Sequence, residues 1–564
     1  VISDDTDEVM PPPKAHKKVL DTRERALVKQ WITEGAAYEG FWAFEPPHSP
    51  SLPPNANPID ALVQQRLQQE GLSPTSPAAK RTLIRRLTLD LIGLPPTPKE
   101  IAAFLADTRP DATARLVDDL LARPQFGENQ ARPWLDLVRF ADTNGMHKDF
   151  YRNLYPYRDW VIRAYNDNLG YDDFLRFQLA GDLFPEPTPD QLTASGFNRL
   201  HLIIDRGTAL PEESYTKNVI DRITAVGTAF LGLTVQCAQC HDHKYDPITQ
   251  KNFYGLYAFF NNLDAPAETP GNPKYGLQAP YISLASDQGM ARKKALDQEA
   301  AALTKKVNQI KTNEKKHAAT KPAPESKNST APASPEGEDT IAKPTPEGTH
   351  AAQTEKRAAK RQTLEKQLSA VKKKQDQWFF NTPHAMVMKE RANPRPSFLL
   401  ERGQYDQHGE EIPRHTPDFL PPLRVSGDLP SRMDLAEWFL DPAHPLTARV
   451  AVNRIWQQFF GVGLVKTAED LGAQGEVPSH PKLLDYLAVR FRESGWDTKS
   501  LIREIVLSDT YLQSSNAKPD AYRTDPENRL LARSSRFRLD AEVIRDQILA
   551  TSGLLNPMKY GKSV

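Results

Sequence analysis

The stretch NVIDRITAVGTAFLGLTVQCAQCHDHKYDPITQKNFYGLYAFFNN, residues 218–262, holds both cysteines of the 564-residue chain. Before the cysteines, apolar residues recur every three or four positions, which predicts an amphipathic helix. A second such run follows Thr249, a residue suited to cap a helix N-terminus. The cysteines therefore lie at a junction between two predicted helices, with apolar walls on both sides.

Cys237 and Cys240 are separated by two residues, and His241 follows directly. Random placement of the cysteines and histidines would give such a run roughly once in ten thousand tries. Two thiols at this spacing can form thioethers to the vinyl groups of one haem, and the next imidazole then reaches the iron. The pattern predicts covalently attached haem c, with Cys237 and Cys240 as attachment sites and His241 as the proximal iron ligand.

Two other kinds of site use paired cysteines. A structural zinc site needs four ligands, so His241 and His243 would have to join both cysteines from one tight loop, without the usual separation between ligand pairs. A thioredoxin-like redox pair expects a βαβ context, whereas the surrounding sequence is helical. Both alternatives stay open but are less favoured than haem.

Further residues are candidates for contacts with the haem. His201 is a candidate distal iron ligand, and the NGMHKD segment (144–149) offers others; for each one alone, a structural role is the more common outcome. His243 is too close to His241 to cross to the distal face, so we expect it to bond Asp246 or a propionate. Arg222 could pair with a propionate or form an ordinary ion pair.

Composition and charge exclude some classes of protein. Lys plus Arg and Asp plus Glu both number 72, so no global field would attract nucleic acid or an anionic membrane. No apolar run approaches the roughly 18 residues of a transmembrane segment, and no signal peptide pattern stands at the start. The chain begins at Val1 rather than Met, which fits a mature or trimmed exported protein, and a fragment of a cytosolic protein would look the same. Because haem c is attached outside the cytoplasm, we expect a periplasmic or otherwise exported location.

Helical periodicity dominates and predicts a mainly α, multi-domain protein. Residues 288–378 are predicted to form an antiparallel helical hairpin, because Leu and Val recur there as in a coiled coil. The tip of this hairpin, about 317–350, has a composition that predicts disorder. We expect the hairpin to be a spacer or an assembly arm through which the chain could oligomerise. The predicted order is an N-terminal segment (1–45), a Pro-rich linker (46–58), a helical haem c domain (59–287), an antiparallel helical hairpin (288–378) and a second mostly helical domain (379–564).

Long motifs carry a family resemblance. FLGLTVQCAQCHDHKYDPITQKNFYGLYAFFNN (230–262) resembles the signature of the planctomycete cytochrome C domain, as do RRLTLDLIGLPPTP (85–98) and WLDLVRFADTNG (134–145). Downstream, PLTARVAVNRIWQQFFGVGLVKTAEDLGAQGEVPSHPKLLDYLA (445–488) and DPENRLLAR (525–533) resemble the planctomycete-specific domain of unknown function that accompanies it.

The resemblance extends to the N-terminus. Residues 10–44 are similar to the tail of a class I-like cytochrome domain that precedes these two domains in the family. In that pattern the first methionine is the distal iron ligand, which implies that Met10 would serve a haem of a missing upstream domain. The chain also stops where the family's last domain continues, so both ends look cut or separately processed.

The motif and the resemblance together imply a c-type haem protein that acts in electron transfer or oxidation. Its partner would be a redox domain or protein, and the family context suggests carbohydrate-derived substrates. One alternative is a haem enzyme with an open iron site that acts on peroxide or another small molecule. Another is a scaffold protein in which the haem only stabilises the fold. No nucleic acid partner is expected.

Overall fold

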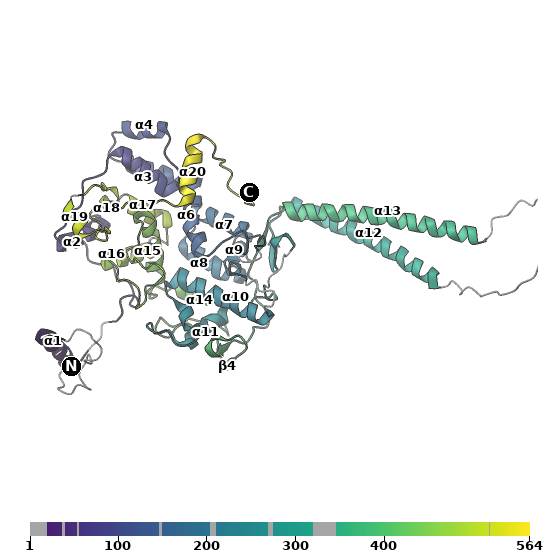
Figure 1. Cartoon of the computed structure of the whole chain (residues 1–564), viewed down its shortest axis with the longest axis horizontal. Helices are drawn as coiled ribbons and strands as arrows, with labels where there is room; N and C mark the ends of the chain where they lie inside the picture. Colours follow the sequence, from purple (N-terminus) through teal and green to yellow (C-terminus); the bar gives the residue numbers. More distant parts are fainter. Residues whose placement is uncertain are drawn as a thin grey trace, which may run out of the picture.

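The computed structural model describes residues 20–36, 40–53, 56–145, 149–203, 210–268, 274–319, 346–517 and 519–563. Within these residues the fold is mainly α-helical, as predicted, with two small sheets. A body of packed helices carries a long helical hairpin that projects from one side (Figure 1). Met10 and residues 146–148 of the NGMHKD segment, both named above as candidate ligands, lie outside the described residues.

Polar caps and apolar stripes explain the N-terminal helices. Asn57 caps the first body helix, and Thr97 forms a capping box with Glu100. A separate helix, α1 (Thr22–Thr33), precedes the body and has no buried residue. The body begins with α2 (Pro58–Gln69), α3 (Lys80–Ile92), α4 (Pro98–Ala106), α5 (Ala112–Ala122), α6 (Pro124–Leu137), α7 (Tyr155–Asn166), α8 (Tyr171–Ala180), α9 (Pro189–Ala194), α10 (Pro211–Val226) and α11 (Gln250–Phe260).

The segment that leads from α10 to the cysteines is wider than an ordinary helix. The apolar period continues to Phe230, but α10 ends at Val226 and a π-helical turn follows over Gly227–Leu231. Gly232 then takes a left-handed conformation with φ +58°, and a Cβ there would lie 2.8 Å from Cγ2 of Val450. The turn therefore brings the chain against a C-terminal helix just before the cysteine motif.

The C-terminal helices share the core of the N-terminal ones. One cluster of buried apolar residues extends from Ala43 to Ala532, and Phe230 contacts Phe439 across it at 5.6 Å between ring centroids. At the periphery, the hydroxyl of Thr510 donates to Oδ1 of Asp60 at 2.7 Å. These helices are α14 (Arg432–Leu440), α15 (Thr447–Phe460), α16 (Pro481–Glu493), α17 (Thr498–Val506), α18 (Asp509–Leu512), α19 (Pro519–Thr524) and α20 (Ala541–Ser552).

The projecting hairpin consists of α12 (Asp287–Ala319) and α13 (Pro346–Asn381), antiparallel as predicted. Its own small core, built around Leu296, Leu303 and Val371, is separate from the core of the body. The predicted disordered tip overlaps the facing ends of both helices, and its middle, 320–345, lies outside the described residues.

Two antiparallel sheets complete the fold. At the base of the hairpin, β1 (Tyr281–Ser283) pairs with β2 (His384–Met386). Near the cysteine motif, β3 (Phe398–Leu400) pairs with β4 (His408–Glu411). Among the helices described, none is both long and apolar enough to cross a membrane.

Candidate functional site

The two cysteines lie on a short 3₁₀ helix at the surface. Cys237 is within Val235–Gln239 and Cys240 directly follows it. Val235 and Ala238 are buried and hold this turn against the body, while both thiols are exposed and form no disulfide. The buried apolar positions of this turn thus leave the two sulfur atoms facing solvent.

His241 is also exposed, and its ring has a defined orientation. Its Nδ1 lies 2.7 Å from the carbonyl oxygen of Asp242. A carbonyl can only accept, so Nδ1 carries a proton and donates, and Nε2 has no hydrogen bond within the described residues. Neutral imidazole in this tautomer is the form that ligates a metal through Nε2.

Neighbouring segments hold the backbone of the motif without using its thiols. The hydroxyl of Tyr254 and the side-chain amide of Gln250 both donate to the carbonyl of Gln239, at 3.0 and 2.9 Å. Beside Cys240 the 3₁₀ turn between β3 and β4 contains Gly403 at φ +72°, where a Cβ would lie 2.8 Å from Sγ of Cys240. Glycine at this position leaves room next to the thiol.

His243, the other histidine of the motif loop, has partners on both ring nitrogens. Its Nδ1 accepts from the backbone amide of Asp246 at 2.9 Å, so Nε2 carries the proton and donates to the hydroxyl of Thr234 at 3.1 Å. Oδ1 of Asp246 also accepts from the amide of Ala473 at 2.7 Å. Asp246 therefore connects the motif loop to the loop between α15 and α16, His243 fixes the motif loop to Asp246 and Thr234, and a zinc site would have to break these bonds to recruit His243.

His201 and Arg222 meet in a buried cluster of charged residues. His201 lies with Nδ1 3.5 Å from Nη2 of Arg222 and Nε2 3.3 Å from Oε2 of Glu268, and burial lowers its pKa to about 4. Nε of Arg222 donates to the carbonyl of Asn198 at 2.7 Å, and its Nη1 is buried without a partner in the described part of the chain. As a distal ligand, His201 would have to exchange one of these contacts for iron; its role and that of Arg222 stay predictions.

The described residues contain no cluster of three or more His, Cys, Asp or Glu side chains suited to hold a metal ion. Haem needs only one protein ligand and two thiols at this motif, so its binding does not depend on such a cluster.

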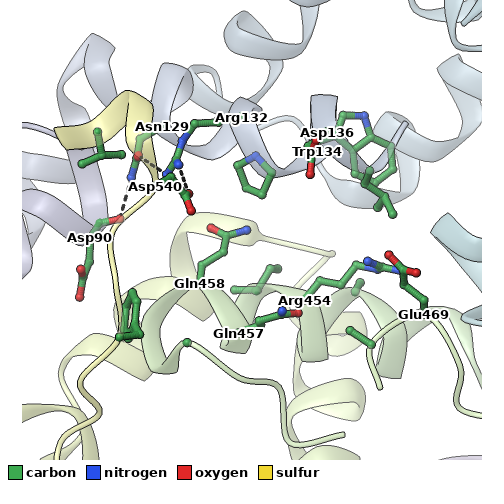
Figure 2. A pocket seen from close by; sticks show the side chains of 18 of the residues that line it. Asp90, Asn129, Arg132, Trp134, Asp136, Arg454, Gln457, Gln458, Glu469 and Asp540 are labelled. Atoms are coloured by element: carbon green, nitrogen blue, oxygen red, sulfur yellow. Dashed lines mark hydrogen bonds and ion pairs between the residues drawn. The ribbon is translucent and has the colours of Figure 1, made fainter. Parts of the chain in front are cut away.

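A cleft of about 810 Å³ opens between α6 and α15 (Figure 2). Its walls come from segments more than 300 residues apart, and Thr234, the partner of His243, also lines it. Periodicity indicates which helix faces are polar but not which of them meet, so the cleft could not be found from the sequence. The labelled polar residues in Figure 2 are Asp90, Asn129, Arg132, Asp136, Arg454, Gln457, Gln458, Glu469 and Asp540.

Two family models match the chain. Residues 58–265 match PSCyt2, a protein of unknown function (DUF1549), and residues 431–564 match PSD1, a protein of unknown function (DUF1553). The chain carries this planctomycete-associated domain pair. The expected pair of domains is thereby confirmed, while their boundaries, the cofactor and the activity stay predictions. No curated protein and no solved structure gives a significant match.

The cleft lies between the PSCyt2 and PSD1 segments, which a buried ion pair also joins. Arg432 of the PSD1 segment donates from Nη1 and Nη2 to the two carboxylate oxygens of Asp182 in the PSCyt2 segment, at 2.9 and 2.7 Å. Its Nε donates to Glu390 at 3.0 Å. Both the cysteine motif and the cleft are therefore at the junction of the two matched segments.

Proposed function

We propose that the chain binds one haem c covalently at residues 237–241 and acts in electron transfer or oxidation outside the cytoplasm. The observation that carries this proposal is the set of accessible groups on one turn: two exposed thiols and an exposed imidazole that has no hydrogen bond at Nε2 within the described residues. Cys237, Cys240 and His241 would hold the haem. Bound there, haem supplies a centre that gains and loses one electron.

The residues around the motif have structural tasks in this proposal. Asp246, which also donates to His243, fixes the loop to the PSD1 segment, and Tyr254 holds the carbonyl of Gln239. The left-handed turn at Gly403 keeps the space beside Cys240 open. A partner redox domain or protein, an exported location and a carbohydrate-derived substrate belong to the same proposal.

Attachment is tested by producing the full chain in a bacterial periplasm that has the haem c maturation machinery. We expect a Soret band and haem that stays with the polypeptide after denaturation. Cys237→Ser together with Cys240→Ser should abolish covalent haem, and His241→Ala should change the spectrum of the iron. His48→Ala, which removes an exposed imidazole elsewhere, is the matched control and should leave both unchanged. Wild-type chain without covalent haem under these conditions would refute the proposal.

The same spectra separate the alternatives. Six-coordinate iron with two protein ligands supports plain electron transfer, whereas a high-spin spectrum and binding of small ligands support a haem enzyme with an open site. The scaffold alternative predicts that His241→Ala lowers stability but leaves reduction potential and substrate oxidation unchanged.

A further inference from the structure

We propose that the cleft between α6 and α15 binds a neutral, polyhydroxylated molecule of the size of a monosaccharide or short oligosaccharide. This inference assigns a binding site to the substrate. Oxidation of the bound molecule rests on the proposed function, whereas its binding does not. The volume of about 810 Å³ lies within the roughly 300–1,000 Å³ of small-molecule sites. Helices α6 and α15 form two facing walls (Figure 2), and loop residues such as Thr234, Glu469 and Phe537 complete the lining.

Several polar side chains that line the cleft have no partner. In the described part of the chain, no hydrogen bond or ion pair engages the side chains of Asp136, Gln457 or Gln458. An amide donates and accepts, and a carboxylate accepts from two sides, so together they can satisfy a ligand that carries several hydroxyl groups. These side chains lie on the two facing helices, Asp136 on α6 and the two glutamines on α15 (Figure 2).

The charges that line the cleft favour a neutral ligand over an anionic one. Arg132 forms an ion pair with Asp540, and Arg454 lies beside Glu469 while its Nη2 donates to the carbonyl of Thr228 at 2.9 Å (Figure 2). The lining has no net positive charge to attract an anion, because it combines four basic side chains (Arg132, Arg454, Lys466 and Arg538) with five acidic ones (Asp90, Asp136, Glu469, Asp470 and Asp540).

An aromatic ring adds an apolar surface to the cleft. Phe537 lines it with 42% of its surface exposed, so apolar ring surface is accessible to a ligand. The ring lies against Gly461 at φ +76°, where a Cβ would meet it at 2.8 Å. A half-exposed ring among hydrogen-bonding groups suits the C–H face of a sugar, which is apolar while its edges are polar.

The cleft is also connected to the cysteine motif. Thr234 lines it and accepts from His243 of the motif loop. Glu469 and Asp470, also lining residues, precede Ala473, whose amide donates to Asp246 of that loop. A ligand in the cleft would therefore contact segments that are hydrogen-bonded to the proposed haem-binding turn.

The test measures binding of glucose, galactose, mannose and xylose to the full chain by saturation-transfer NMR and titration calorimetry. We expect at least one of them to bind at up to about 10 mM. Gln457→Leu and Gln458→Leu remove the amides at similar volume and should each weaken binding about ten-fold. Gln64→Leu, which changes an exposed glutamine on α2, is the control and should bind as the wild type does.

Two further arms decide the ligand class and separate the two proposals. Glucuronate and glucose 6-phosphate should bind more weakly than the neutral sugars; preference for either would overturn the neutral class. Absence of binding by every neutral sugar, or binding unaffected by both leucine variants, would overturn the site. The Cys237→Ser, Cys240→Ser chain should still bind sugar, so failure of haem attachment and failure of this inference are distinguishable.

Discussion

Arg432→Met should destabilise the body more than any comparable change at its surface. The Arg432 side chain is fully buried, donates to both carboxylate oxygens of Asp182 and to Glu390, and also donates to the carbonyl of Leu179 at 2.5 Å. The side chain of Asp182 is only 6% exposed. Methionine fills much of the volume but leaves a buried carboxylate without its counter-charge.

Removing one partner of a buried ion pair costs about 3–5 kcal/mol of unfolding free energy. At roughly 2–4 °C per kcal/mol for a domain of a few hundred residues, the unfolding midpoint should fall by roughly 10 °C. Urea denaturation followed by far-UV circular dichroism and by tryptophan fluorescence measures the change.

Arg176→Met is the matched control. Arg176 connects α8 with Glu437 of α14 at 2.7 Å, but its side chain is 23% exposed and that of Glu437 is 53% exposed. Exposed pairs contribute about 0–1 kcal/mol, so this variant should unfold almost as the wild type does. A double variant, Arg432→Met with Asp182→Leu, should recover part of the loss because no buried charge is left alone. A loss under about 1 kcal/mol for Arg432→Met, or no recovery in the double variant, would refute the reasoning.

Two further predictions concern the core and the pH dependence of stability. Trp456→Ala should lower the unfolding free energy by about 3–5 kcal/mol in urea, because the ring is 1% exposed and stacks on Phe460 at 4.1 Å; a loss below 1.5 kcal/mol would contradict this packing. Burial raises the pKa of Asp90 to about 7, despite its hydrogen bond from Tyr511. The folded state then holds a proton that the unfolded state has released, so this group lowers stability as pH rises from about 4 through 7. Asp90→Asn should raise the unfolding midpoint relative to wild type at pH 8 more than at pH 4.5, and an equal difference at both would contradict the assignment.

Local patterns predicted the helices well where a cap and an apolar stripe coincide. Thr249 caps α11 through its side chain, as predicted, and Ser431 caps α14 in the same way. By contrast, α16 begins at Pro481 with His480 in the cap position and no side-chain cap bond. The apolar period also continues through Phe230, where the structure has a π-helical turn that ends at Gly232, packed against Val450. That contact joins residues far apart in the sequence, so it cannot be predicted from local helix propensity.

Some parts of the candidate site could likewise be predicted from local sequence, and others depend on tertiary contacts. The thiols and His241 could be predicted because all three side chains belong to one motif of five consecutive residues. Their exposure and the ring orientation of His241 depend on the turn that follows Gly232 and could not be predicted from the spacing. The cleft depends wholly on the meeting of α6 with α15, so the unpaired side chains of Gln457 and Gln458 were indistinguishable from ordinary surface residues.

The contact between Asp60 and Thr510 spans 450 residues of the chain and sets a condition on the order of folding. Arg86 of α3 likewise donates to the carbonyls of Tyr511 and Gln513, so the first helices of the body complete their hydrogen bonds only with the last ones. Contacts of such high sequence separation form late and slow the folding reaction. The N-terminal helices therefore keep part of their apolar surface exposed until the PSD1 segment has been synthesised and has packed against them. Over that interval the protein is most exposed to aggregation and most dependent on chaperones.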